Sequence, residues 1–596
     1  MNKNHLRQAR NYVLVVVLFC NLPISLPVAA ETATDLTGLW AAERHFGPEV
    51  RGELTLVRDA HNWRMEIAGR TTDARIEAGY LTAELPAAEG ALRIRLPLDG
   101  KATTGHWVQP QSVVHGQRYA SPVTLQPAGA GRWQGVVVPF EDGFTFHMPV
   151  ERRDDGSLGA FLRNPERNQG IFWRLDRLEL RETEVDFISL RNDQASLLAT
   201  ATRREDDERL SLYVGGRGGT YDFERQPPGS PSSFYPRGKH PAAPYIYRRP
   251  SVAEDGWSVA SLEEAGISQA PIRALIEQHF STPPSSVRDI YPHGLLIARH
   301  GKLVFEQYFH GFHRDRPHDT RSASKSLTSV LAGAAIQSGL PLELTTPVYK
   351  TLRPETSDAE SDPRRARMQL DHLLTMSSGL ACNDSDPDSP GNEETMQEQT
   401  DQPDWYAFTL DLPMAAEPGQ QAFYCSGTAN LAGAVISEGS GESLPDLFQR
   451  LVAQPLQMGR YHLPMTPTGE AYMGGGIRWL PRDFLKLGQL MLNRGTWNGT
   501  RVLSEAWVER SIAPQRELRD RGYGYLWWTV EYPYKERSVR AFFAGGNGGQ
   551  LLIGVPELDL LVAFFAGNYS DRTLFRYQEE FFPEYILAAV QETDSR

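Results

Sequence analysis

The sequence predicts two kinds of architecture in one chain, an all-β region followed by an α/β domain with antiparallel strands. Between residues 31 and 226, short runs of alternating apolar and polar residues recur beside Gly, Asp, Asn and Pro, which is the pattern of a β-sandwich or barrel. From residue 257 onward, strand-like apolar runs are mixed with apolar residues at helical spacing. With 596 residues, 40% of them hydrophobic, the chain is long enough to bury more than one core.

Residues 1–30 have the features of a signal peptide. Basic residues within the first ten positions precede the apolar run 13–19, and the small residues 28–30 precede Glu31. The apolar run is too short for a stable membrane span, and retention as an amphipathic anchor is the alternative to cleavage. We therefore expect an exported chain, periplasmic or secreted after removal of the signal peptide, with no stable membrane insertion.

The predicted all-β domain, residues 31–226, is expected to be a lipocalin-like barrel or a sandwich. Its opening motif, Gly38-Leu39-Trp40, resembles that of lipocalin-like barrels. The clearest strand patterns lie at residues 53–57, 63–67, 92–96, 144–148 and 210–214. The region carries no constellation of catalytic residues. Residues 227–256, rich in Pro, Ser, Gly and Tyr, are predicted to be an ordered linker before a second domain over residues 257–596.

Ser322 and Lys325 are the first candidates for chemistry in this second domain. An apolar stripe predicts one helix over residues 321–339, where Gly339 supplies a stop. Residues three apart on a helix share a face, so Lys325 reaches back to the Ser322 hydroxyl. Serine needs a neighbouring base or a positive field to act as a nucleophile, and lysine supplies either one. A capping serine beside a solvated lysine is the structural alternative.

Two later segments carry further candidate site residues. Tyr424 and Ser426 are two residues apart on an expected loop before a helix, so their side chains are predicted to enter the same cleft. Asn547-Gly548-Gly549-Gln550 leads into an apolar run, and its glycines let a substrate approach the strand backbone.

The remaining elements of the second domain are predicted from apolar runs and turn residues. A hairpin over residues 295–305 turns at His300-Gly301, and strands at 551–555 and 560–565 are expected to join it in one antiparallel sheet. A terminal helix over residues 574–591 is expected to pack on this sheet. Further helices are predicted to form a second lobe, beginning at Ala323, Gln369, Leu431, Leu444 and Pro481.

The three motifs, taken in order along the chain, carry a family resemblance. Ser322-x-x-Lys325, Tyr424-x-Ser426 and Asn547-Gly548-Gly549 make residues 257–586 resemble the serine beta-lactamase superfamily of class C beta-lactamases, DD-peptidases and related serine hydrolases. The resemblance is closest to the 6-aminohexanoate-dimer hydrolase and esterase branch. It implies an α/β hydrolytic domain of the beta-lactamase/transpeptidase type, an antiparallel sheet flanked by helices plus a helical lobe, with the site between the lobes.

The resemblance also implies roles for these residues. Ser322 is expected to form an acyl-enzyme with an amide or ester substrate, activated by Lys325 and Tyr424. The N–H groups of Ser322 and Gln550 are expected to form the oxyanion hole. Ser426, Asn547, Gly549 and Gln550 are assigned to substrate binding or the proton network.

Two departures from the family pattern indicate the substrate class. Ser426 stands where Asn is common, and the neutral Asn547 stands where Lys or His is common. Both departures favour esters or linear amides over penicillins. A DD-carboxypeptidase or penicillin-binding enzyme, and a non-catalytic binding protein with a beta-lactamase-like scaffold, are the alternatives.

Composition excludes other classes of function. The net charge of −13 argues against nucleic-acid and anionic-membrane partners. The family resemblance implies a small-molecule amide or ester as the partner, and the oligomeric state stays open. No cofactor or metal is expected, because no Cys/His cluster has zinc spacing and Pro387 interrupts the calcium-loop-like run that begins at Asp384. Removal of the signal peptide leaves Cys382 and Cys425, as a disulfide or as two buried thiols.

Overall fold

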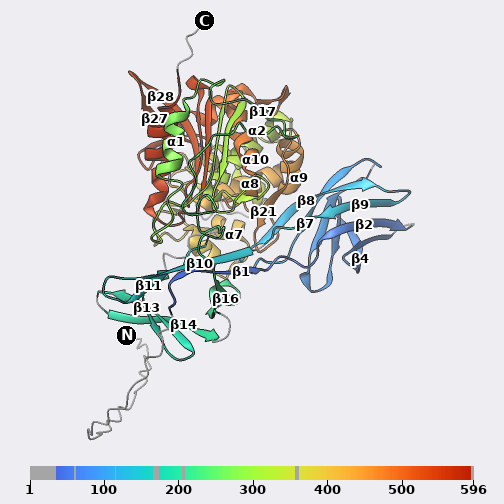
Figure 1. Cartoon of the computed structure of the whole chain (residues 1–596). Helices are drawn as coiled ribbons and strands as arrows, with labels where there is room; N and C mark the ends of the chain where they lie inside the picture. Colours follow the sequence, from blue (N-terminus) through green and yellow to red (C-terminus); the bar gives the residue numbers. More distant parts are fainter. Residues whose placement is uncertain are drawn as a thin grey trace, which may run out of the picture.

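The computed structural model describes residues 35–59, 62–98, 100–113, 116–141, 143–164, 173–192, 194–204, 208–355 and 362–591. The predicted signal peptide, residues 1–30, lies outside these ranges. The described chain forms two β-units and a larger α/β unit (Figure 1). None of the helices in the described ranges is both long and apolar enough to cross a membrane.

The first β-unit is a closed barrel. Its strands, in spatial order, are β1 (Gly38–His45), β10 (Gly143–Arg152), β11 (Leu158–Phe161), β12 (Arg174–Leu180), β13 (Glu184–Arg191), β14 (Gln194–Arg204), β15 (Arg209–Val214) and β16 (Gly219–Arg225). β1 pairs with both β10 and β16, which closes the ring. The interior is filled by apolar side chains, among them Trp40, Phe144, Phe146 and Tyr221, so it is a packed core.

The second β-unit is inserted between β1 and β10 of the first. Its strands are β2 (Gly52–Asp59), β3 (Asn62–Ile67), β4 (Arg70–Glu77), β5 (Tyr80–Glu84), β6 (Ala91–Arg95), β7 (Thr103–Val108), β8 (Arg118–Pro127) and β9 (Arg132–Val137). Each strand pairs with the next, and β9 pairs with both β8 and β2, so these strands also close on themselves. The sequence predicted one all-β domain over residues 31–226, whereas the structure builds two rings with separate cores. The alternation of apolar and polar residues along one strand does not indicate which other strands it pairs with. The sequence pattern therefore could not separate the two rings.

The α/β unit is built on an antiparallel sheet that one parallel edge strand extends. The order is β17 (Ser258–Val259), β19 (Lys302–Tyr308), β18 (Pro292–Arg299), β30 (Leu560–Ala566), β29 (Gln550–Val555), β28 (Arg537–Gly546), β27 (Trp528–Tyr534), β26 (Arg521–Tyr523) and β25 (Arg516–Leu518). The predicted hairpin at residues 295–305 and the two predicted strands after residue 550 all join this sheet. Strands β18, β29 and β30 are buried along their whole length, because helices cover both faces of the sheet.

Helices occupy both faces of the sheet and a separate lobe. They are α1 (Gln269–Gln278), α2 (Lys325–Gln337), α3 (Val348–Leu352), α5 (Leu370–Leu374), α6 (Glu393–Glu398), α7 (Trp405–Asp411), α8 (Ser426–Ser440), α9 (Leu444–Phe448), α10 (Pro481–Leu492), α11 (Glu505–Ile512) and the π-helix η9 (Tyr577–Leu587). Short 3-10 turns include η4 (Arg321–Ser324) and η8 (Arg572–Phe575). Helices α1 and η9 pack on one another over one face of the sheet, and α10 packs on the other.

Three helix predictions require correction. The helix expected over residues 321–339 begins as the 3-10 turn η4 and becomes α-helical only at Lys325. The helix expected from Leu431 begins earlier, at Ser426, because Cys425 Sγ accepts the N–H of Thr428 as an N-cap. The helix from Pro481 was assigned to the helical lobe, but Gly488 brings α10 against Leu552 and Leu561 of the sheet.

The second β-unit is joined to the α/β unit by main-chain pairing. Strand β21 (Tyr461–Met465) pairs with β8, with Leu463 opposite Ala120 (Figure 1). The predicted linker is ordered and packs on the sheet, where the Tyr247 hydroxyl donates a 2.8 Å hydrogen bond to the Val304 carbonyl. The structural unit that carries the motifs therefore includes part of the linker and contacts the β-strands before it.

Candidate active site

Ser322 lies in the 3-10 turn that precedes helix α2. The Asp319 carboxylate accepts the Arg321 N–H at 2.8 Å, and the Ser324 hydroxyl donates to the Arg321 carbonyl at 2.7 Å, so side chains on both sides of Ser322 fix the turn. Arg321 has a left-handed φ of 48°, which turns the chain sharply just before Ser322. Ser322 itself is partly exposed, as a nucleophile must be.

A glycine loop closes on the same turn from the other side. A Cβ on Gly475 would lie 3.2 Å from the Arg321 carbonyl and 3.4 Å from the Ser322 nitrogen. The Gly476 N–H donates to the Arg321 carbonyl at 3.1 Å. The loop therefore supports the main chain of Ser322 at a distance that only glycine allows.

Lys325 is buried directly beside the Ser322 hydroxyl. Its Nζ lies 2.9 Å from Ser322 Oγ and donates a second hydrogen bond, 2.5 Å long, to the Gly474 carbonyl. Burial lowers the pKa of Lys325, but Tyr424 together with the carboxylates of Glu393 and Asp384 outweighs burial and raises the pKa above its usual value. The structure therefore holds Lys325 as an ammonium group, a positive field next to the serine oxygen.

Tyr424 is the third member of this cluster. Its ring centre is 5.0 Å from Lys325 Nζ, and its side chain is 8% exposed. The ring stacks on Trp528 with centroids 5.6 Å apart, which fixes its orientation. Trp527, the neighbouring aromatic residue, is fully buried against Phe542, so only Trp528 reaches the site.

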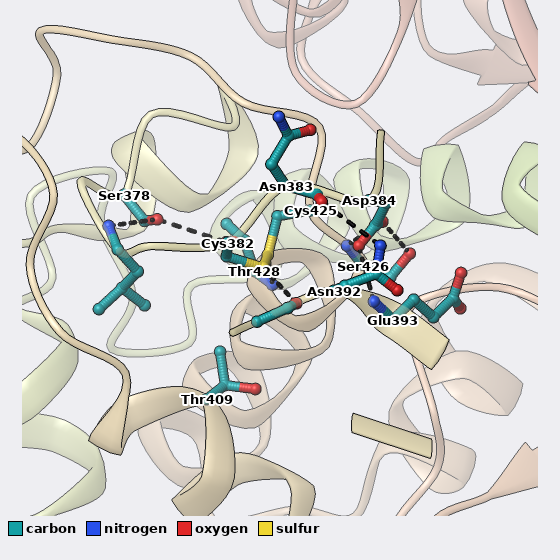
Figure 2. The surroundings of a disulfide bond; sticks show 12 residues. Ser378, Cys382, Asn383, Asp384, Asn392, Glu393, Thr409, Cys425, Ser426 and Thr428 are labelled. Carbon is teal, nitrogen blue, oxygen red and sulfur yellow. Dashed lines mark hydrogen bonds between the residues drawn. A yellow bond between two sulfur atoms is a disulfide. The ribbon is translucent and has the colours of Figure 1, made fainter. Parts of the chain in front are cut away.

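Asp384 is a functional candidate that sequence reasoning missed. Its carboxylate accepts the N–H and the hydroxyl of Ser426, both at 2.7 Å, and the N–H of Glu393 at 3.0 Å (Figure 2). Its own N–H donates to the Tyr424 carbonyl at 2.8 Å. Burial and the Glu393 carboxylate raise the pKa of Asp384, while Lys325 and Ser426 act in the opposite direction. In the sequence, Asp384 stands at the start of an interrupted calcium-like run, a pattern that did not assign it to the site.

Ser426 occupies a different place from the one predicted. It starts helix α8, is fully buried, and its hydroxyl is committed to Asp384. Ser426 therefore connects to the Lys325 cluster through the Asp384 carboxylate, and the hydroxyl does not point into an open cleft beside Tyr424. The extended loop assumed for residues 424–426 ends one residue earlier, at the helix start.

A disulfide links the two segments that meet here. Cys382 and Cys425 are bonded, with Cα atoms 5.6 Å apart. Cys425 lies between Tyr424 and Ser426, and Cys382 lies two residues before Asp384, so the bridge spans the segments that carry these side chains (Figure 2). This resolves in favour of the disulfide a question that the sequence left open.

Asn547 directly follows strand β28, whose last residue lies against the turn that carries Ser322. A Cβ on Gly546, the last residue of β28, would lie 2.4 Å from the Thr320 carbonyl and 3.0 Å from the Ala323 nitrogen. Asn547 is exposed in the following turn, where its side-chain oxygen accepts the Ser570 N–H at 2.8 Å. Gly546, which was not among the predicted site residues, thus lies directly against the Ser322 turn.

Gly549 and Gln550 face other parts of the structure. A Cβ on Gly549 would lie 2.7 Å from the Tyr577 ring of η9, so this glycine permits sheet–helix packing. The Gln550 side chain is buried and exchanges hydrogen bonds with Ala566 of β30. The Gln550 side chain is not bonded to Ser322, Lys325 or Tyr424. A role for the Gln550 main-chain N–H remains a prediction.

Within the described ranges, no group of three or more His, Cys, Asp or Glu residues is arranged to hold a metal ion. His372 accepts the Gln369 N–H at 3.1 Å at the start of α5 and is half-buried. The groups around Ser322 are its own hydroxyl, the Lys325 ammonium, the Tyr424 phenol and the two carboxylates that raise the pKa of Lys325.

Comparison with known proteins agrees with this geometry. The family model described as Beta-lactamase matches residues 293–574. A curated relative, 6-aminohexanoate-dimer hydrolase of Paenarthrobacter ureafaciens, is 25% identical over 251 residues, which cover 39% of this chain and 63% of the relative. The chain thus spans less than two thirds of the length of that relative.

The comparison with solved structures finds chains that are similar over about half of this chain. A family VIII carboxylesterase covers 56% of this chain and 98% of its own, with a TM-score of 0.43 and 15% identity. A penicillin-binding protein homologue from Caulobacter crescentus covers 50% of this chain and 91% of its own, with a TM-score of 0.39 and 14% identity. Residues 293–574 therefore form a domain that matches the Beta-lactamase family model, and the hydrolase relative that aligns with the chain supports a serine hydrolase.

Proposed function

We propose that this chain hydrolyses an ester or linear amide bond through an acyl-enzyme on Ser322. The observation that carries the proposal is the 2.9 Å contact between Lys325 Nζ and Ser322 Oγ, with the carboxylates of Glu393 and Asp384 near the lysine. A serine oxygen beside a buried cation is stabilised as it becomes an alkoxide, which is what nucleophilic attack requires.

In the first step, Ser322 Oγ attacks the carbonyl carbon while its proton passes to the Lys325–Tyr424 pair. Because a charged Lys325 has no free electron pair, the accepting atom is the Tyr424 oxygen, which must be ionised before the attack. Lys325 then stabilises the negative charge first on Tyr424 and later on the developing alkoxide. Main-chain N–H groups, including that of Ser322, receive the carbonyl oxygen, and each such donor contributes about 2.7–4 kcal/mol.

In the second step, Tyr424 returns the proton to the leaving oxygen or nitrogen as the carbonyl–leaving-group bond breaks. The acyl group remains on Ser322 until water, losing a proton to the same pair, attacks the acyl carbon. The pair then returns that proton to Ser322 Oγ as the bond between this oxygen and the acyl carbon breaks and the acid is released. Asp384 and Ser426 hold the Tyr424 segment in place during both steps.

The proposed substrate class is esters and linear amides, with weak or absent turnover of penicillins. Asn547 offers a neutral amide, and its side-chain oxygen is already bonded to Ser570. Charged hydrogen bonds contribute about 1.5–3 kcal/mol and neutral ones about 0.5–1.5, roughly a tenfold difference in affinity. The name of the curated relative states hydrolysis of 6-aminohexanoate dimer, which agrees with this class.

Export is part of the same proposal. A disulfide beside the site is supported only in an oxidising compartment, which fits a periplasmic or secreted enzyme. The predicted signal peptide supplies the route.

The test compares p-nitrophenyl butyrate with nitrocefin as substrates. We expect ester turnover by the unmodified chain, none by Ser322→Ala, and a loss of several orders of magnitude for Lys325→Ala. The double variant should be no less active than Ser322→Ala alone, because the two residues act as a unit. Lys302→Ala, at an exposed lysine on β19, is the matched control and should keep full activity. Clear ester turnover by folded Ser322→Ala contradicts the nucleophile, and efficient nitrocefin hydrolysis with negligible esterase activity contradicts the substrate class.

A further inference from the structure

A short hairpin at the edge of the sheet carries an arginine onto the proposed active site. Strands β25 and β26 pair with Leu518 opposite Arg521, so Arg519 and Asp520 are the two turn residues. Both have left-handed φ angles, 51° and 59°, which is the backbone of the tight hairpin turn that usually contains Asn or Gly. The turn therefore contains a long charged side chain at a position whose left-handed backbone favours Gly or Asn.

The guanidinium of Arg519 is held by two neighbours. Its Cζ lies 4.6 Å from the centre of the Tyr424 ring. The guanidinium also donates a hydrogen bond to the hydroxyl of Ser385, the residue after Asp384. Arg519 thus spans from the sheet edge to the loop that carries Asp384, across the outer side of Tyr424.

The charge of Arg519 is not neutralised where it lies. Arg519 is exposed, and it forms no ion pair with any carboxylate in the described parts of the chain. Arg521, two residues later on the same hairpin, pairs with Glu579 at 3.2 Å and bonds to Gln578. The planar guanidinium has five N–H donors and can bind a carboxylate through two parallel hydrogen bonds. The Ser385 hydroxyl accepts only one hydrogen bond from it, so other donors are left for a ligand.

We propose that Arg519 binds a carboxylate on the leaving group of the substrate. The inference rests on the proposed function, because Tyr424 there protonates the leaving group and Arg519 lies against Tyr424. We expect the carboxylate several bonds from the scissile bond, because the guanidinium contacts the Tyr424 ring and not Ser322 itself. This distinguishes the substrate from a penicillin, whose carboxylate is attached next to the lactam nitrogen. Asn547 is neutral at a position where the resembling family commonly has a positively charged Lys or a His. Arg519 supplies a positive charge from a different element, the turn between β25 and β26.

The experiment uses two esters that differ in one charge. 3-Butyryloxybenzoate and 3-butyryloxybenzamide share the acyl group and the shape of the leaving group, but only the first carries a carboxylate. For the full chain we expect a higher kcat/KM for the benzoate. Arg519→Gln should lower the ratio of kcat/KM for the benzoate to kcat/KM for the benzamide about tenfold, because a neutral hydrogen bond replaces a charged one. Arg519→Lys should keep most of the ratio, and Arg521→Gln, which removes an already paired charge, should leave it unchanged. Added salt should lower the ratio in the unmodified chain, because the group is exposed.

The outcomes separate the inference from the function on which it rests. An unchanged ratio in folded Arg519→Gln, with normal benzamide turnover, overturns the carboxylate site alone. An equal loss on both esters also overturns it, because Arg519 would then act only by holding Tyr424 and the Ser385 loop. Absence of turnover of both esters by the unmodified chain overturns the proposed function, and the inference with it.

Discussion

Asp384 accepts two hydrogen bonds from Ser426, one from its N–H and one from its hydroxyl, and both are 2.7 Å long. The same carboxylate contributes to the raised pKa of Lys325. It therefore links the start of helix α8 to Lys325 and Tyr424, the two residues proposed to accept the serine proton. One partly buried charge thereby fixes the position of Tyr424 and the electrostatics of Lys325.

Asp384→Asn is predicted to lower ester kcat/KM roughly 10- to 100-fold while leaving the fold intact. Hydrogen bonds to a charged group contribute about 1.5–3 kcal/mol, and the variant removes the charge that both Ser426 and Lys325 face. Asp386→Asn, at an exposed carboxylate of the same loop, should have little effect. Steady-state kinetics with circular dichroism as a check on folding decides this, and equal activity of both variants counts against a role for Asp384.

The Cys382–Cys425 disulfide is predicted to stabilise the domain and to hold the site together. It closes a loop with a sequence separation of 43 residues, for which the loop-entropy model gives about 4 kcal/mol. Serine is the replacement of choice at both positions, because the hydroxyl introduced by Cys425→Ser would retain the N-cap of α8 that the Cys425 sulfur provides.

Denaturant unfolding and ester turnover of the double Cys→Ser variant test this prediction. We expect lower stability, lower activity and no further response to dithiothreitol, whereas the unmodified chain should lose activity on reduction. A double variant with unchanged unfolding free energy and unchanged turnover would show that the bridge is dispensable.

His147 is predicted to make stability depend on acid. Burial lowers the pKa of its imidazole from 6.5 to about 3. Between these values the unfolded chain binds a proton that the native chain does not, so the free energy of unfolding falls as pH falls, by about 1.4 kcal/mol per pH unit. His147→Gln should reduce the slope by that amount between pH 6 and pH 4, with the exposed His300→Gln as control. The same slope in His147→Gln and in the unmodified chain would be evidence against this assignment.

The α/β unit is predicted to be unstable without the second β-unit. Strand β21 pairs with β8, the Ser121 hydroxyl lies 2.7 Å from His462 Nδ1, and Tyr247 of the linker bonds to the sheet. A fragment of residues 257–596 loses all three contacts and exposes an unpaired strand edge, which favours aggregation. We expect a lower melting temperature than that of the full chain, and lower solubility. A fragment with the same melting temperature as the full chain and full esterase activity would mean that these contacts are incidental.

The fold of the second domain followed from the sequence wherever a local pattern sets the structure. Glycine at the 300–301 turn and continuous apolar runs near residues 551 and 560 predict strands that the structure contains, because buried strands need apolar residues on both faces. The limits of helices were less predictable. Ser322 is in a 3-10 turn because Asp319 and Ser324 bond to the chain around it, and spacing alone does not report such bonds.

The candidate site was predictable only for residues that form motifs. Ser322 and Lys325 lie three residues apart, so local geometry brings them together. Arg519 reaches Tyr424 through the order of strands in the sheet, and Asp384 reaches Ser426 across a disulfide-linked loop. Both contacts join segments distant in the sequence, and no spacing rule predicts them.

The most direct measurement is the mass of the protein after reaction with a fluorophosphonate, followed by mapping of the modified peptide. The proposed chemistry predicts one adduct per chain, on Ser322, in the native protein, and none in Ser322→Ala or in heat-unfolded protein. Lys325→Ala should form the same adduct far more slowly, because the cation that lies 2.9 Å from Ser322 Oγ is gone. A native protein that no serine-directed probe labels, or one labelled equally fast at another serine in Ser322→Ala, would contradict an acyl-enzyme on Ser322.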